Sequence, residues 1–109
     1  MNGFHNDDER SSWATAEQLM EKGRTMMRQA EHSLELFMIG KEMNRQRCLR
    51  RGIADSDAEI RWAETANAQK ALSDTNFNVT QAMMYYGAAA AHYSRAAYLR
   101  SRDVRPAMP

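Results

Sequence analysis

Three histidines, one cysteine and a group of alternating acids are the residues of this chain whose types suit metal binding or catalysis. The residue three positions before His32 is Gln29, and the residue three positions before His92 is Ala89, so neither is glutamate. The Glu-x-x-His pairs of di-iron helical bundles are therefore absent. His5 lies near the N-terminus, away from both. We interpret the histidines as surface or interface residues, and we expect no metal site and no cofactor.

The alternating acids Asp55, Asp57 and Glu59 resemble the start of a calcium-binding loop. Ile60 stands where such a loop requires glycine. Capping of a helix N-terminus explains these acids instead. Cys48 has Arg47 beside it but no adjacent histidine to act as a base, so we expect a small residue near a helix end. No catalytic constellation emerges, and we expect a protein that is not an enzyme.

The composition indicates one soluble domain. The chain has 109 residues, of which 43% are hydrophobic and 27% charged, and its formal net charge is +1. A polycation that seeks nucleic acid or anionic lipid is excluded by that charge. No apolar run approaches the roughly 20 residues of a membrane-spanning helix. The acidic, polar start MNGFHNDDER is unlike a signal peptide, which predicts a cytoplasmic protein without membrane partners.

The elements that carry these residues are predicted to be helices. Both prolines lie in the last four residues, and alanine, methionine, arginine and glutamate are abundant, which favours helix throughout. Gly52, preceded by Arg50 and Arg51, is suited to end a helix. Ser56 and Glu59 form a capping box that starts the next one. We predict an all-α hairpin over 12–102, with helices over about 12–51 and 57–101, a tip over 52–56, and flexible ends over 1–11 and 103–109. Residues 6–9 are an alternative, earlier cap.

Apolar residues in both predicted helices alternate at spacings of three and four, which defines a heptad seam. Small seam residues, such as Gly23 and Ala82, alternate with large ones. Folding the chain at Ile53 aligns large seam residues with large ones and small seam residues with small ones, as in an alanine-rich antiparallel coiled coil. The large seam residues are predicted to face each other in the pairs Trp13 and Tyr93, Met20 and Tyr86, Met27 and Val79, and Leu34 and Leu72, with Phe37 nearest the tip.

Residues 73–76 are poor helix formers, and they offer the alternative that the second helix is divided there. The seam keeps its phase across them. We therefore predict a continuous helix through this segment.

A second apolar surface lies off the seam, and one partner helix cannot cover it. The stretch 82–91 is apolar on all sides, which is typical of a helix buried against several neighbours. We predict a homo-oligomer, most simply a dimer of hairpins that forms a four-helix bundle. The alternative is a different protein on the same face. The predicted oligomer interface comprises Leu19, Met26, Phe77, Met83, Met84, Tyr85, Ala88, Ala91 and Tyr98.

A basic stretch at the predicted tip is the candidate contact for a macromolecular partner. Its cations are Lys41, Arg45, Arg47, Arg50, Arg51 and Arg61. Solvated helix ends that complement the dipole are the structural alternative. The functional interpretation is a contact for an acidic protein surface or for phosphates. A second cluster, from Arg95 to Arg105, has acids such as Glu17 and Glu21 at the same end of the predicted hairpin.

Three hypotheses of function follow. The first is a non-enzymatic interaction protein, such as an adaptor, assembly factor or inhibitor. The second is a dimer that binds nucleic acid through its tips, although a reader motif is missing. The third rests on length and two-helix architecture, which resemble the WXG100 family of small secreted hairpins. The Trp-x-Gly turn of that family is absent, because the turn here is Arg50-Arg51-Gly52 with Trp62 well beyond it. In appearance the chain is also similar to small helical proteins of phages and mobile elements.

Overall fold

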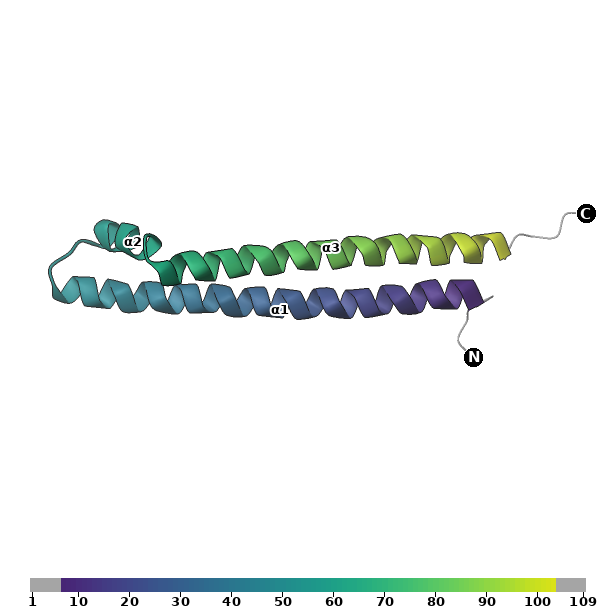
Figure 1. Ribbon diagram of the computed structural model, residues 1–109, viewed down its shortest axis with the longest axis horizontal. Helices are drawn as coiled ribbons and strands as arrows, with labels where there is room; N and C mark the ends of the chain where they lie inside the picture. The colour runs from purple at the N-terminus through teal and green to yellow at the C-terminus, as the bar shows by residue number, and fades with distance from the viewer. Residues whose placement is uncertain (1–6, 104–109) are drawn as a thin grey trace, which may run out of the picture. The chain divides into compact units, whose positions relative to one another are not determined.

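The computed structural model describes residues 7–103, and in this range its regular elements are all helices (Figure 1). Two long helices, α1 (Asp7–Arg50) and α3 (Ala66–Asp103), are joined by the short helix α2 (Asp55–Ala63). This confirms the predicted all-α class. Residues 1–6 and 104–109 of the predicted flexible ends, including Arg105, lie outside the described residues. The helix α1 begins at Asp7, earlier than the predicted residue 12.

The described residues divide into two compact units, residues 7–25 with 81–103, and residues 26–80. In the first unit, which we call the terminal unit, α1 and α3 pack antiparallel. Trp13 contacts Tyr93 with ring centroids 4.9 Å apart, and farther along α1 the Tyr86 ring lies on Gly23. In the second, the tip unit, α1 packs antiparallel against α2 near the turn and shares a groove with α3.

Small residues spaced by seven form the buried line of the terminal unit. Ala16, Ala82 and Ala89 are completely buried, and Ala96 is 3% exposed. Gly23 continues this spacing on α1 and is also buried. The larger seam residues lie beside this line and are half-buried or exposed, and Trp13 is 43% exposed. The helices therefore approach closely, but they bury little apolar area per residue.

The predicted register did not include one contact of this unit, between Tyr86 and Gly23. A Cβ added at Gly23 would lie 2.5 Å from Cε1 of Tyr86. At this layer a large residue, Tyr86, therefore packs on a small one, Gly23. A ring can approach a helix this closely only where the residue beneath it has no side chain. The predicted pair of Trp13 and Tyr93 is in contact.

The turn after α1 has the conformation predicted for Gly52. Its φ is 73°, the left-handed value that favours glycine. The Ile53 N–H donates to the Cys48 carbonyl at 2.9 Å, and the Gly52 N–H donates to the Leu49 carbonyl at 3.0 Å. These two bonds form a Schellman motif. Cys48 itself is 7% exposed, as a free thiol packed at the end of α1.

The predicted single second helix is wrong, because the chain breaks at Glu64 and Thr65. The Thr65 hydroxyl accepts a hydrogen bond from the Ala68 N–H at 3.1 Å, so Thr65 caps the start of α3. It also donates to the Trp62 carbonyl at 2.7 Å. The capping box predicted at Ser56 is wrong as well, since α2 begins at Asp55 after Ala54, without a side-chain cap.

The predicted continuity through residues 73–76 is confirmed, because α3 runs through them without a break. The Thr75 hydroxyl donates to the Ala71 carbonyl at 2.8 Å. This bond within the helix satisfies a side chain that otherwise favours turns.

Two glycines of the terminal unit provide a matched test of this packing. An added Cβ at Gly87 meets no atom within 4 Å, whereas one at Gly23 meets the Tyr86 ring. Both Gly→Ala changes gain about 1 kcal/mol of helix propensity. We expect Gly87→Ala to stabilise the protein, and Gly23→Ala to be less stable than Gly87→Ala by about 1–3 kcal/mol, the usual cost of overpacking. Chemical denaturation measures both, and equal stabilisation by the two changes would contradict the ring-on-glycine packing.

Candidate interaction surfaces

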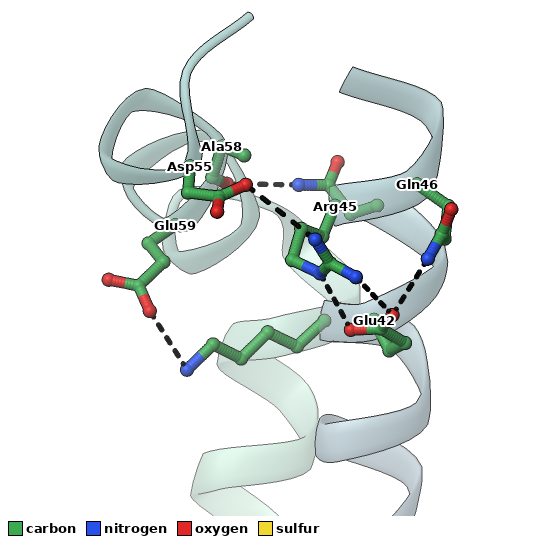
Figure 2. Close-up of polar contacts among 8 residues, drawn as sticks. Glu42, Arg45, Gln46, Asp55, Ala58 and Glu59 are labelled. Carbon is green, nitrogen blue, oxygen red and sulfur yellow. Dashed lines mark hydrogen bonds and ion pairs between the residues drawn. The ribbon is translucent and has the colours of Figure 1, made fainter. Parts of the chain in front are cut away.

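The tip unit is organised by contacts between α1 and α2 (Figure 2). Asn44 donates its side-chain amide to the Ala58 carbonyl at 2.9 Å. Lys41 forms an ion pair with Glu59, with 3.2 Å between Nζ and Oε1. These contacts, at successive turns of α1, hold the short helix alongside it. Ala58 is almost completely buried between them.

Arg45 is the centre of the charged network drawn in Figure 2. Its guanidinium forms two hydrogen bonds with the Glu42 carboxylate, at 2.9 Å and 2.8 Å. Its Nη1 also lies 3.8 Å from Oδ1 of Asp55 on α2. Gln46 donates a further hydrogen bond to Glu42. Hydrogen bonds from Arg45 and then Gln46 lower the pKa of Glu42 to about 2, because they stabilise its charged form.

The predicted basic tip is therefore divided into two groups of cations. Lys41 and Arg45 are paired with acids, two of which belong to α2. The others are exposed, and the described part of the chain records no ion pair for them: Arg47, Arg50, Arg51 and Arg61. The tip carries fewer available cations than its sequence indicates.

Trp62 is the aromatic anchor of the tip unit, and it belongs to neither predicted seam. It is 8% exposed. Its ring lies against Gly40, where an added Cβ would be 2.8 Å from Cζ2. The Phe37 ring is tilted beside it, with centroids 5.6 Å apart. Gly40 is the signal in the sequence that could have located this contact. A glycine within a stretch of good helix formers indicates a place where another group approaches the backbone closely. The indole N–H is buried without an acceptor among the described residues.

A groove of about 430 Å³ opens beside Trp62. Leu36, Ile39 and Met43 of α1 line one side, and they are 50–59% exposed. The opposite side comes from α3 and is mainly polar. The lining residues are Leu36, Ile39, Gly40, Met43, Arg47, Trp62, Asn67, Lys70, Ala71 and Asp74. A smaller hollow of about 320 Å³, which includes Met38, lies among the charged residues of α1 and α2.

The residues predicted as the oligomer interface differ in exposure. Most on α3 face solvent, with 63–65% exposure at Phe77, Met83, Met84 and Tyr98, and Ala88 and Ala91 are also exposed. Leu19, Met26 and Tyr85 are half-buried beside the helix contact. Lys22 lies 5.9 Å from the centre of the Tyr85 ring.

The predicted seam residues are divided between the two units. In the terminal unit Met20 is half-buried, and the Tyr93 hydroxyl donates to Glu17 at 2.6 Å. This bond raises the pKa of Tyr93. In the tip unit Met27 is half-buried, whereas Leu34, Leu72 and Val79 are 37–45% exposed. Phe37 packs on Trp62 and has no seam partner recorded on α3 among the described contacts.

Among residues 7–103, no three histidine, cysteine, aspartate or glutamate side chains gather where a metal could bind. Within the same range, no helix has both the length and the apolarity that crossing a bilayer requires. Comparisons with models of protein families, with curated proteins and with solved structures find no match to this chain.

The network around Arg45 predicts an unusual titration. The charged form of Glu42 is the one that Arg45 and Gln46 bind, so its stabilising contribution is present at neutral pH and is lost as the pH falls towards 2. We expect the Glu42 carboxyl carbon to titrate near 2 by NMR. Arg45→Ala should move that midpoint up, towards the ordinary glutamate range. An unchanged midpoint would show that Arg45 does not hold this carboxylate in solution.

Proposed function

We propose that the chain is a non-enzymatic helical interaction protein that self-associates and presents its tip unit to a partner protein. The observation that carries this proposal is a second heptad row on α3. Met84, Ala88, Ala91, Arg95 and Tyr98 follow one another at spacings of four and three, and all five are exposed.

This row lies on the side of α3 that faces away from α1. Met84, Ala91 and Tyr98 each come two residues after a buried alanine, at positions 82, 89 and 96. Two residues correspond to about 200° around a helix. The outer side of α3 thus carries a heptad row of its own, in which two small residues, Ala88 and Ala91, lie between larger ones. A helix with heptad rows on opposite sides is suited to packing between two neighbours.

Energetics support the same proposal. The helix contact in the terminal unit buries mainly alanine and glycine, so its hydrophobic contribution is small. Large side chains of α3, such as Met83 and Met84, remain exposed to water. Association of two copies into a four-helix bundle would remove part of that surface from water.

The divided tip favours a protein partner over nucleic acid in this proposal. Two of its six cations are engaged by acids, which reduces the charge available for phosphates. Trp62 is buried, so it offers no face on which a base can stack. Arg47, Arg50, Arg51 and Arg61 remain for an acidic protein surface.

A matched pair of alanines tests the self-association. Ala88 lies in the outer row of α3, whereas Ala90 is also exposed but lies about 200° farther around the helix. We expect Ala88→Glu to lower the mass to that of a monomer, because it buries a charge in the interface. Ala90→Glu should keep the oligomeric mass. Light scattering after gel filtration, over a concentration series, measures both.

Circular dichroism of the two variants is the control for helicity. Equal masses for the two variants would contradict an interface on this row. A monomeric unmodified protein at every concentration would contradict self-association altogether.

A further inference from the structure

The groove of the tip unit is bounded by two helices of different chemistry. Its α1 side presents Leu36, Ile39 and Met43, at spacings of three and four, so their side chains form one apolar stripe. Arg47, four residues farther along α1, continues the stripe with a cation. The α3 side presents polar residues, including Lys70 and Asp74.

The charges that line this groove are not equally available. Lys70 is paired with Asp74, with 2.8 Å between Nζ and Oδ2. Arg47 forms no ion pair within the described range, and Arg50, three residues farther along α1, is also exposed. The apolar stripe therefore ends in uncompensated positive charge.

We infer that this groove binds an amphipathic helix of another protein, whose apolar stripe covers Leu36, Ile39 and Met43 and whose flanking carboxylates pair with Arg47. Helices with apolar residues at spacings of three and four are the usual occupants of such grooves. Carboxylates form charge-assisted hydrogen bonds with guanidinium groups, often bidentate ones. The inference rests on the proposed function as an interaction protein, and it names the chemistry of the partner.

Charge also argues against a second copy of this chain as the occupant. The exposed outer row of α3 is the helix face that the proposed self-association uses. Its only charged member is Arg95, and Arg100 and Arg102 follow it. This face has the same sign of charge as Arg47, so the two are not complementary. An acidic helix from a different protein avoids this conflict.

Three designed peptides of 18 residues test the inference. The first carries a leucine stripe flanked by glutamates. The second keeps the leucines and replaces the glutamates with lysines, and the third keeps the glutamates but scrambles the leucines. The protein carries Trp13→Phe, so that fluorescence reports Trp62 beside the groove alone. We expect the first peptide to bind at least tenfold more tightly than either of the others, with an affinity that falls as salt is added.

Two exposed methionines of α1 provide the matched control. Met43 lines the groove, and Met38 lines the separate hollow among the charged residues. We expect Met43→Glu to weaken binding of the glutamate peptide at least tenfold, and Met38→Glu to change it by less than twofold. Arg47→Glu should abolish the preference for glutamate over lysine, whereas Arg51→Glu should preserve it.

Light scattering on the same variants separates this inference from the proposed self-association. Absence of binding, equal binding of the glutamate and lysine peptides, or equal loss from the two methionine variants would overturn the inference, whatever the oligomeric mass. A fall in mass caused by Met43→Glu but not by Met38→Glu would also overturn it, because a second copy would then occupy the groove. A tightly bound glutamate peptide with unchanged mass would support it.

Discussion

Close approach of α1 and α3 along a line of alanines and glycine is the constraint on which the terminal unit depends. Ala16, Ala82 and Ala89 are completely buried because nothing larger fits between the two backbones at those layers. The larger seam side chains lie at the flanks, where part of their surface meets water. The same feature that lets the helices approach therefore leaves apolar area uncovered. We connect the proposed association with other helices to this geometry.

The tip unit meets a different requirement. In a continuous second helix, α2 would have to follow the same axis as α3. The break at Thr65 removes this requirement and lets α2 take a direction of its own. Trp62 can then lie over Gly40 and against Phe37, and Lys41 and Arg45 can reach acids of α2. The cost is a buried indole N–H without an acceptor among the described residues. The groove beside Trp62 is a consequence of this local arrangement.

Periodicity in the sequence predicts the helical class and the buried small residues of the seam, such as Ala16 and Ala89. It does not predict that large seam residues such as Leu34 remain partly exposed, and it leaves the register open. A heptad seam looks the same after a shift, so the pairing of Met20 with Tyr86 had no independent support. What decides the register locally is a ring that needs a glycine beneath it at Gly23. The break before α3 was missed because Thr65 keeps a helical pattern on both sides, and its capping role depends on the hydroxyl contacts alone. The ion pairs of the tip depend on the direction of α2, which spacing does not specify.

Cys48 gives the tip unit an internal reporter. Its side chain is packed at the end of α1, and its carbonyl accepts hydrogen bonds from the N–H groups of Arg51 and Ile53. Because Cys48 is only 7% exposed, opening of this helix end should strongly increase access of a thiol reagent to the sulfur. The rate of labelling should therefore report on local opening of the tip as well as on global unfolding. Since this is the chain's single cysteine, the signal has one source.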